Sequence, residues 1–487
     1  MEGRRLEARD VGHGSHVMST VGDLAFLPAV ELARLVAERE VSAEEVMSAA
    51  IDRVGRHNPV VNAVVTLSPH ALDDARAVDR RLARGEDPGP LAGVPVGIKD
   101  MTAVAGLRTT YGSPLYADHV PTEDALVVRR LRAAGAVVVG KTNTPEFAAG
   151  ANTFNDVFGA TRNPWDPALS AGGSTGGGAA GLATGMFALA EGTDLGGSLR
   201  IPAAFCGVTG LRPSPGLVPT EPTDWVWDSI MVTGLMARAA GDVALGLAAV
   251  AGPSAGLPFR QPVAGRDFPA AARAGMAHGA RIAYCADLAG MGVDAGVEGV
   301  CREAAFALGG AGAAVEEIDL DLSHARRAFL DLRGRWMVAH HQDRLHRIGE
   351  LGPNLAGNIR AGLATTAGRL GRADQVRSDL WHRFARLRRD YDYLITPTTA
   401  VPPFPVDQSH PTEIAGRRLE TYVDWFAPTF VLSLTGLPVA SVPAGLDSRG
   451  LPVGLQVVGP PAGEEAVLAL AATLERLRPP ERPSLAE

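Results

Sequence analysis

Lysine is almost absent from this chain. Only Lys99 and Lys141 are lysines among its 46 basic residues, and the other 44 are arginines. A buried lysine can lose its proton near neutral pH, whereas an arginine keeps its proton at any working pH. Lys99 ends the apolar run "VPVGIK" at residues 94–99, which indicates a buried strand. A lysine kept at this point of an arginine-rich chain indicates a role in proton transfer.

Cysteine, net positive charge and long apolar runs are also scarce. Cys206, Cys285 and Cys301 lie far apart without a C-x-x-C pair, which predicts buried thiols, a cytoplasmic location and no metal site. The net charge is −8 and no basic block is present, so nucleic acid is not expected as a partner. The longest apolar stretch is interrupted by glycines and too short to span a bilayer, so no membrane partner is expected either.

The rest of the composition is that of a folded globular protein. Hydrophobic residues make up 46% and charged residues 21% of the 487-residue chain, which predicts a large core. Residues 1–20 are polar and have no apolar signal region, so we expect a disordered segment there. The fold is then expected over residues 21–487, although length alone leaves one to three domains open.

Helical and strand patterns alternate along the chain. Residues 123–140 predict a helix followed by a strand, and residues 281–320 predict strand, helix and strand. The sequence "RRDYDYLITPTT" at residues 388–399 predicts a helix end leading into a strand. This alternation predicts an α/β fold with a large sheet covered by helices on both faces. The arginine-rich region at about 325–390 has no strand signal and predicts a helical cap.

Two short patterns compete in the glycine-rich centre. Residues 172–176, "GGSTG", match the G-x-S-x-G turn of α/β-hydrolases, and the glycines at 176, 178 and 181 match a dinucleotide-binding pattern. Both patterns require a strand immediately upstream. Residues 161–171, "TRNPWDPALSA", contain two prolines and make a poor strand, which disfavours both interpretations.

A second stretch, "DLGGS" at residues 194–198, places a hydroxyl directly after two glycines. Backbone N–H groups in such a turn can converge on one point and form an oxyanion hole, with Ser198 as the nucleophile. The expected donors are the N–H groups of Leu195, Gly196, Gly197 and Ser198. A serine nucleophile needs a base, and none of the twelve histidines stands in a recognisable motif. Lys99, at the end of a buried strand, is the better candidate.

Three motifs together resemble the amidase signature family. They are "GVPVGIKD" at 93–100, "GGSTGGG" at 172–178 and "GTDLGGSLRIPA" at 192–203. Supporting matches, in family order, are "GKTNTPEF", "FGATRNPWD", "CGVTGLRPSPG", "YDYLITPTT", "TGLPVASVPAG" and "GLPVGLQVVG". The resemblance spans about residues 23–475 and implies a single domain built on a large mixed sheet.

The resemblance also implies a catalytic triad of Lys99, Ser174 and Ser198. Ser198 is then the nucleophile, Ser174 is a bridging serine that follows a cis peptide bond after Gly173, and Lys99 is the base. Asp194 and Arg200 are expected to form an ion pair that shapes the oxyanion turn. Such a relay needs no metal and no cofactor.

The remaining expectations concern the substrate pocket. The residues expected to contact substrate are Ala148, Ala149, Gly173 and Thr175, and Trp225, Trp227 and Trp336 are candidates for an aromatic wall. Thr175 and Gly178 stand where the family motif has serines, so part of the usual hydrogen-bond network is in doubt.

The sequence as a whole predicts an amidohydrolase that forms an acyl-serine intermediate. Its predicted partner is a small-molecule amide, ester or carbamate (urethane), and we expect a monomer or a homodimer. The alternative, from another class, is the glutamine-hydrolysing A subunit of a tRNA-dependent amidotransferase.

Overall fold

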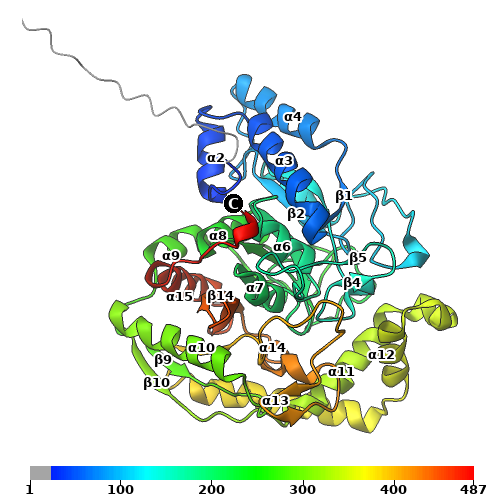
Figure 1. The fold of residues 1–487 in the computed structure, drawn as a ribbon, viewed down its shortest axis with the longest axis vertical. Helices are drawn as coiled ribbons and strands as arrows, with labels where there is room; N and C mark the ends of the chain where they lie inside the picture. The colour runs from blue at the N-terminus through cyan, green and yellow to red at the C-terminus, as the bar shows by residue number, and fades with distance from the viewer. Residues whose placement is uncertain (1–23, 487) are drawn as a thin grey trace, which may run out of the picture.

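A computed structural model describes residues 24–486, and the segment predicted to be disordered, residues 1–20, lies outside the described residues. An eleven-stranded sheet runs through the molecule (Figure 1). In sheet order its strands are β1 (Val64–Leu67), β3 (Val137–Thr142), β2 (Pro95–Lys99), β6 (Leu189–Asp194), β8 (Val232–Ala237), β7 (Thr209–Arg212), β14 (Val439–Leu446), β15 (Pro452–Val458), β11 (Tyr393–Pro397), β9 (Arg281–Tyr284) and β10 (Ala314–Glu317).

The sheet is mixed. Strands β3, β2 and β6 run parallel to one another at one side, and β11, β9 and β10 do so at the other. The strands between these two groups pair in antiparallel fashion. The α/β class and the large mixed sheet predicted from the sequence are confirmed.

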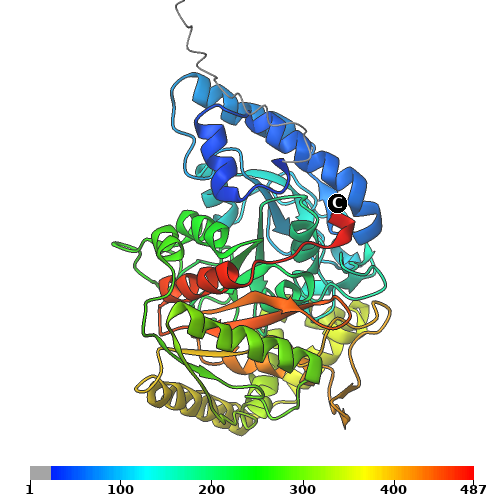
Figure 2. The same ribbon diagram turned by 60° about the vertical axis from the view of Figure 1, so that its left-hand side comes forward.

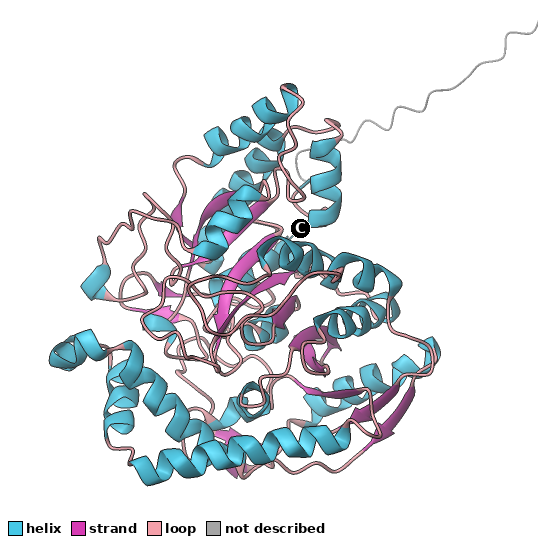
Figure 3. Cartoon of the chain, turned by 180° about the vertical axis from the view of Figure 1, so that it is seen from behind, coloured by secondary structure: helices cyan, strands magenta, loops and turns pink. Residues whose placement is uncertain are grey.

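Helices cover both faces of this sheet (Figures 2 and 3). They are α2 (Ala29–Ala37), α3 (Ala43–Val61), α4 (Ala71–Ala83), α5 (Leu126–Ala133), α6 (Gly176–Ala183), α7 (Arg200–Cys206), α8 (Ala240–Val250), α9 (Phe268–Ala274), α10 (Ala295–Ala307), α14 (Ala427–Ser433) and α15 (Glu464–Leu477). Ser42 and Glu45 form a reciprocal capping box that fixes the start of α3.

The arginine-rich region is a group of helices in the lower part of Figure 1. It contains α11 (Ala325–His340), the 3₁₀ helix η4 (Gln342–Glu350), α12 (Pro353–Leu363) and α13 (Ala367–Leu387). Helix α11 packs against both α12 and α13. Helix α11 also contacts α14, whose Thr429 hydrogen-bonds to Gly196 in the glycine-rich segment.

The glycines of α6 allow this helix to lie unusually close to the sheet. A Cβ at position 177 would stand 2.3 Å from the backbone nitrogen of Asn143, and a Cβ at 181 would stand 2.2 Å from the ring of Phe187. Every residue of α6 is buried. The glycine-rich stretch thus serves close packing of a helix that begins directly after Ser174 and Thr175.

Candidate active site

Lys99 is the last residue of the buried strand β2 and is fully enclosed. Its Nζ forms hydrogen bonds with Ser174 Oγ at 2.7 Å, Thr175 Oγ1 at 3.0 Å and Thr193 Oγ1 at 3.0 Å. Strand β6, which carries Thr193, pairs in parallel with β2. The sheet therefore brings the motif at 93–100 and the motif at 192–203 side by side.

The environment of Lys99 favours its neutral form. Burial lowers the pKa of Lys99 to about 7, although the negative charges of Glu191 and Asp194 act in the opposite direction. A neutral amine has two N–H donors and one lone pair. At neutral pH Lys99 can therefore accept a proton from one of the three hydroxyls around it.

The peptide bond between Gly173 and Ser174 is cis, as the resemblance implied. Only glycine fits at position 173, because a Cβ there would stand about 3 Å from the backbone of Ala151 and Asn152. The Thr175 N–H donates to the carbonyl oxygen of Ser198 at 3.1 Å. This bond links the segment that carries Ser174 to the turn that carries Ser198.

The turn at residues 194–198 differs from the expectation in one donor. The N–H of Gly197 donates to Asp194 Oδ1 at 2.8 Å, and Gly197 does not line the cavity beside the turn. The expectation that the Gly197 N–H is an oxyanion donor is therefore wrong, because this N–H group closes the turn instead. Within residues 24–486 the N–H groups of Leu195, Gly196 and Ser198 have no hydrogen-bond acceptor, and all three residues line the cavity.

The side chain of Asp194 holds this turn in place through its hydrogen bonds and ion pairs. Arg200 binds both its carboxylate oxygens, at 2.9 and 3.0 Å, so the expected ion pair is present. Arg212 binds the carbonyl oxygen of Asp194 and lies 3.3 Å from Oδ1. Although burial opposes ionisation, the two guanidinium groups hold the pKa of Asp194 well below its ordinary range. Thr429 Oγ1 donates to the Gly196 carbonyl at 2.7 Å and fixes the turn from α14.

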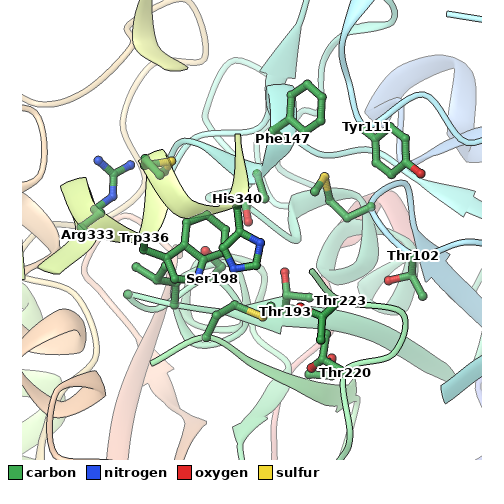
Figure 4. Close-up of a pocket in the computed structure, with 18 of the residues that line it drawn as sticks. Thr102, Tyr111, Phe147, Thr193, Ser198, Thr220, Thr223, Arg333, Trp336 and His340 are labelled. Carbon is green, nitrogen blue, oxygen red and sulfur yellow. The ribbon is translucent and has the colours of Figure 1, made fainter. Parts of the chain in front are cut away.

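A cavity of about 270 Å³ lies beside Ser198 (Figure 4), and Ser174 also lines it. Its remaining wall is largely aromatic and apolar, with a row of threonines on one side. The main wall residues are Met101, Tyr111, Phe147, Phe329, Trp336, Met337, Phe426, Thr102, Thr193, Thr220, Thr223 and Thr233. The structure thus brings the three residues of the expected triad together: Ser174 and Ser198 line the cavity, and Lys99 lies beneath Ser174.

The expected substrate contacts are only partly correct. Ala148 lines the cavity, but Ala149 lines a neighbouring cavity of about 550 Å³, because the chain turns between the two residues. Gly173 and Thr175 lie beneath the cavity wall, where Thr175 contacts Lys99 instead of substrate.

Of the three candidate tryptophans only Trp336 lines the cavity. Trp225 belongs to a smaller hollow beside it, and the side chain of Trp227 is 66% exposed. The expected aromatic wall is therefore formed by Trp336 together with phenylalanines and Tyr111.

Several site residues were missed in the sequence. Thr193 and Arg212 stand within the motifs "GTDLGGS" and "TGLRPSPG", so their motif positions were the available signal. Residues 329, 333, 336, 337 and 340 share the face of α11 that lines the cavity, and their spacing by three and four was the signal there. Glu191, whose carboxylate accepts from the Lys99 N–H at 3.2 Å, carried no signal.

Residues 24–486 contain no cluster of three or more histidine, cysteine, aspartate or glutamate side chains able to hold a metal ion. Over the same residues, every helix is too short or too polar to cross a membrane.

Comparison with known proteins assigns the family. The amidase family model matches residues 45–468. An acylamidase of Rhodococcus erythropolis is 37% identical over 468 residues, covering 94% of this chain and 97% of the relative. The A subunit of the glutamyl-tRNA(Gln) amidotransferase of Acidothermus cellulolyticus is 36% identical, covering 93% of this chain and 95% of the relative.

Solved structures agree with this match. A bacterial aryl acylamidase of the amidase signature family superposes with a TM-score of 0.88 at 28% identity, over 94% of this chain and 97% of that chain. A 6-aminohexanoate cyclic dimer hydrolase gives 0.85 at 28% identity, over 96% and 100%. The chain belongs to the amidase signature family. It is an enzyme that hydrolyses carbon–nitrogen bonds other than peptide bonds.

Proposed function

We propose that this amidase works through an acyl-Ser198 intermediate, with Ser174 as a proton bridge and Lys99 as the base. The observation that carries the proposal is the 2.7 Å hydrogen bond between Lys99 Nζ and Ser174 Oγ, in a site where burial holds the pKa of Lys99 at about 7. A charged, exposed lysine could not serve as a base at neutral pH.

In the acylation step Ser198 Oγ attacks the substrate carbonyl carbon. The Ser198 proton moves to Ser174, and the Ser174 proton moves to Lys99. The negative charge on the carbonyl oxygen is stabilised by the N–H groups of Leu195, Gly196 and Ser198. When the carbon–nitrogen bond breaks, Ser174 protonates the departing amine and recovers its proton from Lys99. Water then attacks the acyl-enzyme through the same relay and releases the acid.

The aromatic and apolar cavity supports a substrate with an apolar part. Phe147, Phe329, Trp336, Met337 and Phe426 offer contact area next to Ser198. The similarity to an acylamidase and to an aryl acylamidase supports the same class. We therefore propose neutral, fairly apolar amides as substrates, with esters and carbamates, including urethanes, as further substrates of the same relay.

The glutamine-hydrolysing subunit is the second candidate, because several relatives carry that name. It is less well supported, since most of the cavity wall is apolar, with charged side chains among the described residues only at Glu221, Asp224 and Arg333, and glutamine is a small, zwitterionic amino acid. The proposal also includes a cytoplasmic location, in keeping with free thiols at Cys206, Cys285 and Cys301, and a monomer or homodimer that needs no second kind of subunit.

A substrate panel tests the proposal. The purified chain alone should hydrolyse anilides and apolar aliphatic amides, and should turn over the corresponding esters and carbamates. Glutamine should be a poor substrate. Turnover of glutamine alone, or activity only after a second subunit is added, would replace this proposal by the amidotransferase function.

A further inference from the structure

His340 is a hydrogen-bonding side chain in the cavity that the serine–lysine relay does not use. It is the last residue of α11, and its ring projects from the helix into the cavity (Figure 4). Its side chain is 18% exposed. The cavity wall it joins also contains Ser198, so a group on a bound substrate can reach it.

The His340 ring is held in one orientation by aromatic neighbours. It lies 4.1 Å from the ring of Trp336, with 30° between the planes, and 5.8 Å from the ring of Trp225. Trp336 precedes His340 by one helical turn, so both side chains belong to the same face of α11. The ring nitrogens are therefore presented in fixed directions.

One nitrogen faces a carboxylate. His340 Nε2 is buried, has no hydrogen-bond partner within residues 24–486, and lies 3.7 Å from Asp228 Oδ2, beyond hydrogen-bond distance. Asp228 is itself fixed, because Oδ1 accepts from the N–H groups of Ile230 and Met231, and Oδ2 accepts from Trp336 Nε1 at 2.6 Å. A lone pair on Nε2 would be repelled by this carboxylate, which favours the tautomer with its proton on Nε2.

The other nitrogen is left free. In the tautomer with its proton on Nε2, the ring presents a lone pair at Nδ1. Nδ1 has no hydrogen-bond partner within residues 24–486, and unlike Nε2 it is not enclosed by protein atoms. A polar atom without a partner beside the nucleophile is completed by the molecule that fills the cavity.

We propose that His340 is a specificity-determining residue that accepts, through Nδ1, a hydrogen bond from an O–H or N–H group on the substrate. The proposal rests on the proposed function and deepens it. The substrate class is an amide with an aromatic or apolar body whose non-reacting part carries a hydroxyl or amino donor. Asp228 acts through His340 as a positioning residue, since it selects the tautomer.

The test compares a hydroxyl-substituted anilide with its methyl ether, which keeps the acceptor oxygen, lacks the donor and adds one methyl group. The wild-type enzyme should prefer the hydroxyl compound in kcat/KM by on the order of 10-fold, the usual value of one hydrogen bond. His340→Phe keeps the stacking on Trp336 and removes both nitrogens. It should bring the ratio of the two substrates close to one, whereas His346→Phe, at an exposed histidine nearby, should leave the ratio unchanged.

Two further readouts separate the possible failures. Cleavage of the unsubstituted anilide tests the proposed function alone. If the wild-type enzyme fails to cleave it, the proposed function is wrong, but the role of His340 can still be tested by the binding ratio. If His340→Phe is poorly folded, the binding constants of the two anilides for the Ser198→Ala and Ser198→Ala/His340→Leu proteins give the ratio without turnover, because leucine has no hydrogen-bond acceptor. A wild-type preference for the methyl ether, or an unchanged ratio in the His340 variants, would overturn the role of His340.

Discussion

At the scale of single residues, the scarcity of lysine drew attention to Lys99 but could not by itself distinguish it from Lys141. Lys99 and Lys141 are both fully buried, and burial lowers the pKa of both, to about 7 and about 8. Only Lys99 reaches serine hydroxyls. Lys141 Nζ instead donates to the Thr102 carbonyl and to Thr109 Oγ1 at 2.9 Å. Composition thus singled out two lysines, and only the motif around Lys99 separated the candidate base from Lys141.

The donors of the oxyanion turn could be predicted only in part. The "DLGGS" sequence predicts a turn with several N–H groups on one side. It does not predict which N–H group donates a hydrogen bond to the Asp194 carboxylate, because that depends on the path of the chain after Gly196. The position of Ala149, one residue beyond a cavity residue, was unpredictable for the same reason.

Replacing Lys99 tests its role as a base. Lys99→Met keeps most of the apolar stem and removes the amine, whereas arginine would overpack a site that is fully enclosed. We expect kcat/KM to fall by about 100- to 10,000-fold, the usual effect of losing general-base catalysis. Circular dichroism and thermal unfolding should show a folded protein. Near-wild-type activity in folded Lys99→Met would contradict the role of Lys99.

The pH dependence of the wild-type enzyme gives a second prediction for Lys99. The base must be neutral, so kcat/KM should be low below the pKa of Lys99 and should rise as pH increases through about 7. A pH–rate profile on an uncharged anilide measures this midpoint directly. A midpoint close to 10, the ordinary value for lysine, would show that the base is not the buried Lys99.

At the scale of elements, the glycine-rich segment before α6 shows what a short sequence pattern can and cannot predict. "GGSTG" fits the nucleophile turn of α/β-hydrolases, and only the missing upstream strand argued against that interpretation. In the structure, residues 161–171 form isolated bridges and turns, and α6 begins two residues after Ser174. The burial of all of α6 was not predictable, because glycine is as common in exposed turns as in close contacts.

The two departures of this segment from the family motif are physically linked. A Cβ at position 178 would stand 2.9 Å from the methyl carbon of Thr175, so the threonine methyl fills the space that a serine at 178 would use. Gly178→Ser should therefore lower the free energy of unfolding by about 1–3 kcal/mol, as overpacking does. The Thr175→Ser/Gly178→Ser double variant should recover most of this loss.

Urea unfolding of the two single variants and the double variant measures the linkage as a double-mutant cycle. Thr175→Ser alone keeps the hydroxyl that binds Lys99 and serves as the matched control. Strict additivity of the two substitutions would contradict a direct contact between positions 175 and 178.

At the scale of the whole molecule, the fold class could be predicted and the strand order could not. Alternating helix and strand patterns indicate α/β, but they do not tell that β6 pairs with β2, some 90 residues earlier in the chain, as its register shows. The C-terminal strand β15 likewise lies between β14 and β11. The cavity wall depends on this strand order, since α11, the loop before β8 and the "DLGGS" turn come together only in the folded chain.

Glu475 joins the C-terminal helix to distant parts of this fold. Its carboxyl faces inward from α15 and accepts hydrogen bonds from Thr209 Oγ1 at 2.6 Å and from the Ala240 N–H at 2.9 Å. Burial raises the pKa of Glu475 to about 7. The folded state then binds this proton more tightly than the unfolded state, so its contribution to stability is lost as pH rises from about 4.5 to about 7.

Glu475→Gln removes this titration while keeping a hydrogen-bonding side chain of the same size. We expect the difference in unfolding free energy between pH 5 and pH 8 to shrink by up to about 3 kcal/mol relative to the wild type. Urea unfolding at the two pH values provides the measurement. An identical pH dependence in both proteins would show that Glu475 is not protonated in the folded state.

The central claim is that Ser198 is the nucleophile and that Ser174 serves it as a proton bridge. Reaction with an activated fluorophosphonate, followed by intact-mass analysis and peptide mapping, tests this claim most directly. The account predicts a single adduct on Ser198 in the wild-type enzyme, no adduct in Ser198→Ala, and slow labelling of Ser198 in Ser174→Ala. An adduct on Ser174, or undiminished labelling of Ser198→Ala, would contradict it.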